Sequence, residues 1–153
     1  MDFKRIIEEI LKGNDIEQLM ERIDWKEFEA FCAKILEEHD WNVQKNYRFK
    51  NERRYEIDLL AKKGRLVLAI DCKHWGIRQG KSTQLRYAVE KQMERTKALS
   101  NVKTLDSIGK QRRFHSLIIT MLKEDIESHN DVWIVPVFSL NNFLLEIENY
   151  LDS

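Results

Sequence analysis

Two aspartates and a lysine within residues 55–75 (YEIDLLAKKGRLVLAIDCKHW) have types and spacing that suit a metal-assisted hydrolytic site. Asp58 and Asp71 supply carboxylates for Mg²⁺ or Mn²⁺, an ion that uses few protein ligands and keeps several waters. Such an ion activates water and stabilises the charge that develops when a phosphodiester is hydrolysed. Lys73 can orient or deprotonate the attacking water, and the backbone carbonyl of Cys72 is a candidate further ligand.

A β-hairpin would bring these side chains together. Residues 55–61 and 66–72 are rich in β-branched, aromatic and long apolar side chains, as strands are. Residues 62–65 between them are polar and contain a glycine, which is typical of a tight turn. The sequence therefore predicts a hairpin, and we take Lys63-Gly64 as its two central turn residues.

In that register the two aspartates are diagonal cross-strand neighbours. Asp58 faces Ala69, which leaves Asp58 and Asp71 about 7–8 Å apart at the backbone. Because side chains alternate along a strand, both aspartates and Lys73 point to the same face. The opposite face is expected to be apolar and to pack in the core, through Ile57, Leu59, Leu66, Leu68, Ile70 and Cys72.

One acidic side chain upstream can join this set. Asp24 and Glu27 form the capping box of a helix that runs from Trp25 to about Glu38. Glu29 lies seven residues before Leu36 and therefore about 20° from it around the helix axis, at the margin of the apolar stripe. Two interpretations stay open: a carboxylate at the edge of a packed stripe, or a carboxylate aimed over the sheet at the aspartates.

Charge is unevenly distributed along the chain. The 26 Lys and Arg balance the 26 Asp and Glu, but residues 43–115 carry 19 basic against 7 acidic side chains. Residues 1–42 (6 basic, 12 acidic) and 116–153 (1 basic, 7 acidic) carry the opposite excess. A basic region around an acidic pair favours a polyanion that a metal ion must approach, such as a phosphate backbone.

Four further residues are candidates for nucleic-acid contact. Arg78 and Lys81 lie in a glycine-bracketed loop, GIRQGK, immediately after the lysine of the candidate site. Gln84 lies on the flank of a helix that begins at Ser82 or Thr83 and reaches about Ser100. Gln92 lies within the inward stripe of that helix, where its amide either satisfies a backbone group or reaches the site.

The remaining elements predict an α/β fold with a mixed central β-sheet of about five strands flanked by α-helices, in the order α-βββ-α-β-β-α after extra N-terminal helices. We expect one domain over residues 1–153, with a helical extension at 1–23 and the core at 24–151. Residues 50–54 read as a charged connection and 123–131 as a loop or short helix. Pro136 favours an edge position or a bulge for the strand that contains it.

Composition excludes several classes of protein. No apolar run approaches the roughly 20 residues of a membrane span, and acids stand where a secretory signal has its apolar segment. We therefore expect a cytoplasmic protein. Cys32 and Cys72 occupy apolar positions without a CxxC or Cys/His cluster, which indicates buried free thiols in place of a zinc site.

These motifs resemble the PD-(D/E)xK nuclease superfamily, whose fold is called restriction endonuclease-like, and most of all Mrr-type restriction endonucleases and archaeal Holliday-junction resolvases. FEAFCAKILEEHDWNV is similar to the first helix and strand of the family, with Glu29 at its helix carboxylate. YEIDLLA matches the metal-binding aspartate at Asp58, and AIDCKHW matches the (D/E)xK strand at Asp71 and Lys73. Ile57 replaces the nominal proline.

The resemblance implies a Mg²⁺- or Mn²⁺-dependent DNA endonuclease. Asp58 and Asp71 would be metal ligands, Lys73 catalytic, and Glu29 a support for metal or water. The substrate would be double-stranded or branched DNA, and a homodimer would suit two-fold cutting. Two alternatives stay open: a catalytically silent nuclease-like module that binds DNA or assembles with partners, and a structural protein whose carboxylates pair with Lys73 and Arg78.

Overall fold

The computed structural model of the protein describes residues 5, 23–74, 82–102, 112–121 and 126–151. Its core is a mixed six-stranded sheet with the strand order β1-β2-β3-β4-β6-β5. The elements in chain order are α3 (Trp25–Glu38), β1 (Asn42–Asn51), β2 (Arg53–Lys63), β3 (Leu66–Lys73), α4 (Ser82–Ser100), β4 (Arg113–Thr120), β5 (Glu127–His129), β6 (Val132–Pro136), η2 (Val137–Ser139), α5 (Leu140–Leu145) and α6 (Ile147–Leu151).

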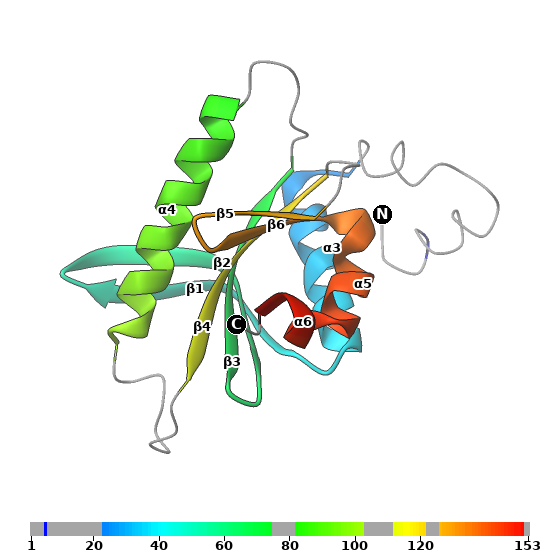
Figure 1. Ribbon diagram of the computed structural model, residues 1–153, viewed down its shortest axis with the longest axis horizontal. Coiled ribbons are helices and arrows are strands. Elements are labelled where there is room, and N and C mark those ends of the chain that lie inside the picture. Colours follow the sequence, from blue (N-terminus) through cyan, green and yellow to red (C-terminus); the bar gives the residue numbers. More distant parts are fainter. Residues whose placement is uncertain (1–4, 6–22, 75–81, 103–111, 122–125, 152–153) are drawn as a thin grey trace.

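Helices cover both faces of the sheet (Figure 1). The larger core packs α3, α5 and α6 against one face, and α4 packs against the other. Strands β3, β4 and β6 are parallel, whereas β1–β2, β2–β3 and β5–β6 are antiparallel. This architecture confirms the α/β fold with a mixed sheet flanked by helices. No helix in the described part of the chain is long and apolar enough to cross a membrane.

Helix α3 begins at the predicted capping box. The N–H of Glu27 donates to Asp24 Oδ1 at 2.8 Å, and the N–H of Asp24 donates to Glu27 Oε1 at 3.1 Å. Two otherwise unsatisfied donors are thereby satisfied, which fixes where the helix starts. Phe28, Cys32 and Leu36 are fully buried, so the start of the helix and its apolar stripe together determine which way Glu29 points.

The β2–β3 hairpin turns one residue later than predicted. Lys63 pairs with Leu66, so Gly64 and Arg65 are the central turn residues, and Gly64 has φ +60°. A positive φ at the first central position is characteristic of a type II′ turn and is easily adopted by glycine. Moving the turn by one residue moves every pairing by two, so the paired residues of β2 and β3, from Leu59 to Ile70, keep their faces.

Strands β1 and β2 form a longer hairpin than predicted. Residues 50–54 are not a connection: Lys50 pairs with Arg54, and Glu52, with φ 65°, is the residue between the two strands. The pairing of β1 with β2 is interrupted once, between Asn46 and Asp58, and Asn46 has φ 52°. We call residues 47–57, beyond this interruption, the arm.

The arm changes the face to which its side chains point. Val43 and Leu59 pack on the α3 side of the sheet, but Tyr47 and Ile57 pack with Leu99 of α4 on the other side. The prediction that Ile57 shares a face with Leu59 is therefore wrong. The left-handed backbone at Asn46 and the missing pair with Asp58 break the simple alternation of side chains at this point.

Residues 127–129 form an additional strand at one edge of the sheet. Glu127–His129 forms β5, a three-residue strand where a loop or short helix was predicted. It pairs with β6 from Val132 to Ile134 only, so Pro136, the last residue of β6, lies beyond its partner. The missing N–H of Pro136 therefore leaves no β5 residue without a hydrogen bond, although β6 is not itself the edge strand.

Candidate active site

Four predicted side chains from three elements gather at the end of β3 where Lys73 lies. The carboxyl groups of Asp58 and Asp71 are within hydrogen-bonding reach of each other. Lys73 Nζ lies 3.1 Å from Asp71 Oδ2. Glu29, from α3, is close enough for the charge of Asp71 to act on it. The structure thus brings together Glu29, Asp58, Asp71 and Lys73.

Asp58 lies where β2 leaves β3. The last pair of the β2–β3 ladder is Leu59 with Ile70, and one step further Asp58 stands next to Asp71. There the backbone N–H of Cys72 donates to Asp58 Oδ2 at 3.0 Å. A side chain has thus taken the place of a strand partner, and this hydrogen bond fixes the orientation of the Asp58 carboxyl group.

The Asp58 carboxyl is held in an environment that disfavours its charge. Burial raises the pKa of Asp58 to about 7, together with the hydrogen bond to Asp71 and the Asp71 charge. The N–H of Cys72 acts in the opposite direction but does not compensate. Two carboxyl groups that converge in this way need either a shared proton or a cation between them.

Lys73 forms the open side of the cluster, next to the buried Asp71. Asp71 is 6% exposed, and its Oδ2 atom has no hydrogen-bond partner, so the 3.1 Å approach of Lys73 Nζ is an ion pair without hydrogen-bond alignment. The Lys73 side chain is 29% exposed. Its ammonium group can therefore contact both Asp71 and a molecule that approaches from solvent.

Glu29 is the most buried acid of the cluster. It is 4% exposed, and its Oε2 atom is buried without a hydrogen-bond partner. Burial raises the pKa of Glu29, and the charges of Asp71 and then Glu56 raise it further. Both sequence interpretations therefore hold in part, because Glu29 is packed at the helix margin and is also directed at the aspartate pair.

The donor set fits a hard divalent cation. Asp71 Oδ2 and Glu29 Oε2 are buried beside the Asp58 carboxyl and have no hydrogen-bond partner among the described residues, and carboxylate oxygens are what Mg²⁺ and Mn²⁺ prefer. No group of three or more His, Cys, Asp or Glu side chains within the described residues would hold a metal by itself. A cation here would therefore use few protein ligands and complete its shell with water, as Mg²⁺ does.

Cys72 contributes backbone groups, while its thiol lies in the core. It packs in the same apolar cluster as Cys32, and both are buried free thiols, as predicted. The hydrogen bond with Cys32 and burial hold the pKa of the Cys72 thiol well above its ordinary range. The carbonyl of Cys72, between Asp71 and Lys73 in sequence, stays a candidate ligand.

The predicted nucleic-acid contacts separate into three groups. Arg78 and Lys81 lie outside the described residues. Gln84 is exposed on the first turn of α4. Gln92 is 1% exposed; its Nε2 donates to the carbonyl of Ala69 at 2.7 Å, and its Oε1 accepts from Arg95. Its prediction as a nucleic-acid contact is therefore wrong, and it ties α4 to β3.

His74 lies beside the cluster and was not predicted from the sequence. His74 follows Lys73, its ring lies 5.7 Å from that of Phe28, and its Nε2 atom is buried without a partner. Its only signal in the sequence is its position next to the lysine of the motif.

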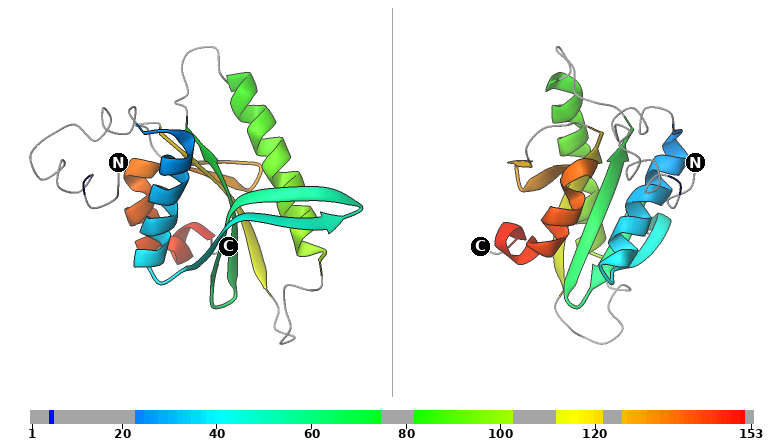
Figure 2. Two further views of the ribbon diagram at one scale, coloured as in Figure 1. Left: turned by 180° about the vertical axis from the view of Figure 1, so that it is seen from behind. Right: turned by 90° about the vertical axis from the view of Figure 1, so that its right-hand side faces the viewer.

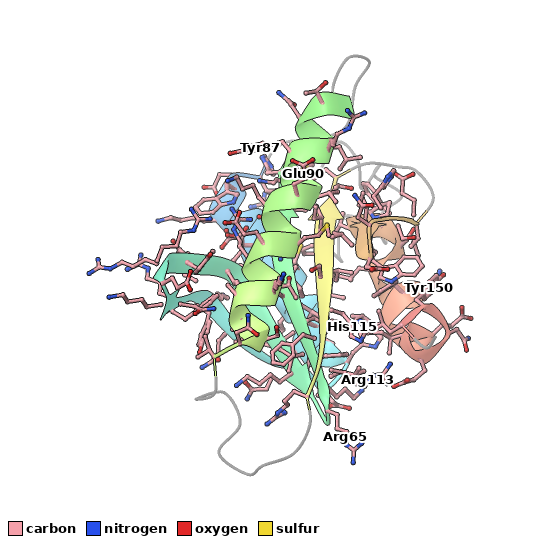
Figure 3. The ribbon with its side chains drawn as sticks, turned by 60° about the vertical axis from the view of Figure 1, so that its left-hand side comes forward. Arg65, Tyr87, Glu90, Arg113, His115 and Tyr150 are labelled. Atoms are coloured by element: carbon pink, nitrogen blue, oxygen red, sulfur yellow. The ribbon has the colours of Figure 1, made fainter. Side chains whose placement is uncertain are left out.

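A hollow of about 880 Å³ lies far from this cluster, at the other end of β3 and β4. Its walls include His115 and Tyr150, and Figure 3 shows His115 and Arg113 projecting from β4 towards the helix that carries Tyr150. The lining holds no convergent pair of carboxylates. We place the candidate site at the carboxylate cluster, because hydrolysis of a polymer backbone needs the right chemical groups on an open surface more than it needs an enclosed volume.

Two comparisons relate this chain to known proteins. Residues 20–104 match the family Mrr_cat, described as a restriction endonuclease. An uncharacterized protein of Archaeoglobus fulgidus is 32% identical over 128 residues, which is 83% of this chain and 94% of that protein. The family match spans α3, the three antiparallel strands and α4, and therefore includes all four clustered side chains.

Proposed function

The chain belongs to the Mrr-type restriction endonuclease family, and from this premise we propose that it is a Mg²⁺- or Mn²⁺-dependent DNA endonuclease. The observation that carries the proposal is the convergence of Asp58 and Asp71 beside Lys73, with buried carboxylate oxygens that have no hydrogen-bond partner among the described residues. Clustered acids inside the most basic segment of the chain serve a pure binding protein poorly, because they repel the phosphate backbone.

Asp58 and Asp71 would hold the cation, with the Cys72 carbonyl as a further ligand and Glu29 supporting the ion or its water. When bound, such a cation polarises the phosphoryl oxygens and activates water for attack. The hydrogen bond from the Cys72 N–H fixes the Asp58 carboxyl group in place before any ligand arrives, which lowers the cost of assembling the site.

Lys73 would act on the reacting groups directly. Its ammonium is ion-paired to Asp71 and still partly exposed, so it can orient the attacking water and compensate the negative charge that builds on the phosphorus oxygens. Asp71 would thereby hold two partners, the cation and Lys73, and fix their relative positions.

A homodimer is part of the proposal, because cutting both strands of a duplex or junction calls for two centres. Light scattering of the purified protein, alone and with duplex, measures this directly. A monomer that still cuts both strands of one duplex in a single binding event would contradict the dimer without affecting the nuclease proposal.

The test uses supercoiled, linear and four-way-junction DNA with Mg²⁺, Mn²⁺ or EDTA, with Lys73→Ala in parallel. We expect cleavage by the wild type in either metal, and none in EDTA or with the variant. An absence of metal-dependent cleavage on every substrate would refute the enzyme; DNA binding that persisted would then support a nuclease-like binding module.

A further inference from the structure

The arm has two faces of opposite character. One face is aromatic and packs towards α4: the rings of Phe49 and Tyr55 stack at 5.2 Å, and Tyr47 stacks on Phe49 at 6.0 Å. Two polar contacts fasten this face to the helix. Asn51 Nδ2 donates to the carbonyl of Ala98 at 3.1 Å, and Arg53 pairs with Glu94. The arm is therefore held against α4, and Figure 2 shows it reaching across that helix.

The other face is exposed and basic. We call it the basic face, and it consists of Arg48, Lys50, Arg54 and Glu56, all of them exposed. Lys50 stands directly opposite Arg54 in the β1–β2 pairing. Like charges directly across a strand pair repel and destabilise the hairpin, so this placement costs stability unless an anion compensates it.

Within the described part of the chain, few acidic side chains neutralise the like charges of Lys50 and Arg54. Neither Lys50 nor Arg54 makes an ion pair there, and the one acid of the face, Glu56, pairs with Arg48 at 3.8 Å. The Arg48 side chain remains 80% exposed in that pair. A hollow of about 640 Å³ runs between these cations and the edges of the aromatic pair, lined by Arg48, Phe49, Lys50, Arg54, Tyr55 and Glu56.

The basic face continues directly from the catalytic cluster. Asp58 is the residue at which the arm begins, and the charge of Glu56, two residues away, acts on Glu29. At about 3.3 Å per residue, the Arg48–Glu56 pair lies about 7 Å along the strand from Asp58, and the Lys50–Arg54 pair about 13 Å. These cations therefore lie in a row that leads outward from the candidate ligands.

We propose that the basic face binds the phosphate backbone of duplex DNA beside the bond that is cut. This inference rests on the proposed function and adds a binding surface to it. Thirteen ångströms correspond to about four base pairs at 3.4 Å of rise per step, so the contacts fall within about four base pairs of the scissile phosphate. Arginine and lysine hold phosphates without reading bases, so the surface contributes affinity and positioning but no sequence preference.

The test compares Lys50→Gln/Arg54→Gln with a matched control, Arg65→Gln/Lys97→Gln, which removes two exposed cations elsewhere. Binding to a 30-base-pair duplex is measured by fluorescence anisotropy in EDTA at several salt concentrations. Each lost phosphate contact removes about eightfold in affinity at 0.1 M salt, so the arm variant should bind roughly 10- to 60-fold more weakly. The slope of log K against log salt should fall by about 1.8, and the control should match the wild type.

Cleavage gives a second readout. At saturating duplex, kcat of the arm variant should equal that of the wild type, whereas KM should rise with the loss of affinity. Thermal unfolding should show a melting temperature no lower than that of the wild type, because the like-charge pair has been removed.

The outcomes separate the two proposals. If the wild type cleaves and the arm variant has unchanged affinity and salt slope, the basic face is not a DNA-binding surface and the nuclease proposal stands. A wild type that never cleaves, beside an arm variant with weakened binding, overturns the nuclease and leaves the basic face. No binding of duplex by the wild type overturns the basic face.

Discussion

The backbone N–H of Cys72 donates to Asp58 Oδ2 at 3.0 Å, so the strand that carries one candidate ligand also orients the other. The same strand supplies Asp71 and Lys73 on either side of Cys72. The relative positions of three candidate side chains therefore depend on one strand end, and changes at that end should affect metal binding, stability and cleavage in separable ways.

Asp58→Asn should stabilise the metal-free protein at pH 8. The pKa of Asp58 is raised to about 7 in the fold, against about 3.9 in an unfolded chain, so its contribution to stability is complete below about pH 4. That contribution is lost as the pH rises through about 7, because the carboxyl must then ionise beside Asp71. Allowing for its partial exposure, we expect the variant to gain about 1–2 kcal/mol at pH 8 and nothing at pH 4.

Denaturant unfolding in EDTA at both pH values measures this difference. Asp40→Asn is the matched control, since Asp40 is exposed and its φ of 67° suits asparagine as well as aspartate. Equal stability of Asp58→Asn and wild type at pH 8 would contradict the raised pKa.

Mn²⁺ should raise the melting temperature of the wild type at pH 8. A ligand that binds only the folded state stabilises by about 2.7 kcal/mol at a hundred times its dissociation constant, and here it also relieves the repulsion between Asp58 and Asp71. Asp71→Asn should abolish the increase, and Glu29→Gln should reduce it if Glu29 supports the ion. Differential scanning fluorimetry with a Mn²⁺ titration tests all three proteins, and an Asp71→Asn protein that responds like the wild type would exclude Asp71 as a ligand.

Lys73→Ala should lower kcat by about 10²- to 10⁴-fold while leaving duplex affinity within about twofold. The reason is that Lys73 is proposed to act on the reacting groups, whereas most of the affinity comes from phosphate contacts elsewhere. Single-turnover cleavage and anisotropy separate the two effects. Lys34→Ala, which removes an exposed lysine paired with Glu38, is the control and should change neither quantity.

Gln92→Leu should destabilise the fold by about 1–3 kcal/mol, because it leaves the buried carbonyl of Ala69 without its donor. DNA affinity should not change, since the Gln92 side chain is buried between α4 and β3. Gln84→Leu on the exposed face of the same helix should leave stability nearly unchanged. Thermal unfolding and anisotropy of both variants check the structural role; weakened binding with full stability would restore Gln92 as a contact.

The sequence placed Asp58 and Asp71 close together for a specific reason. The predicted turn at Lys63-Gly64 was one residue early, but that error shifts cross-strand partners by two, so the paired residues of β2 and β3 keep their faces and Asp58 comes next to Asp71. Ile57 was misplaced because alternation fails at Asn46, which has a left-handed backbone and no partner in β2. A three-residue strand such as β5 is too short to show a period.

Burial was the other quantity that residue types could not decide. Gln92 could have satisfied a backbone group or reached the site, and only the packing of α4 on β3 selects the first. Residues 50–54 were predicted to be a charged connection because the side chains of Lys50, Glu52 and Arg54 are neither β-branched nor aromatic, as those of strands often are. A charged strand of this kind can be assigned only from the strand with which it pairs, and that pairing is seen only in the folded chain.

The single interruption between Asn46 and Asp58 also makes the arm a module whose length can be changed. Beyond that point β2 is paired with β1 and no longer with β3, so residues inserted at the tip beside Glu52 leave the pairing of Leu59 with Ile70 untouched. Insertions of two residues in each strand would keep the basic face where it is and extend its reach by about 7 Å. The distance between the carboxylate cluster and the outermost cation of the arm can therefore be lengthened in fixed steps of two residue pairs, without altering a residue of the cluster.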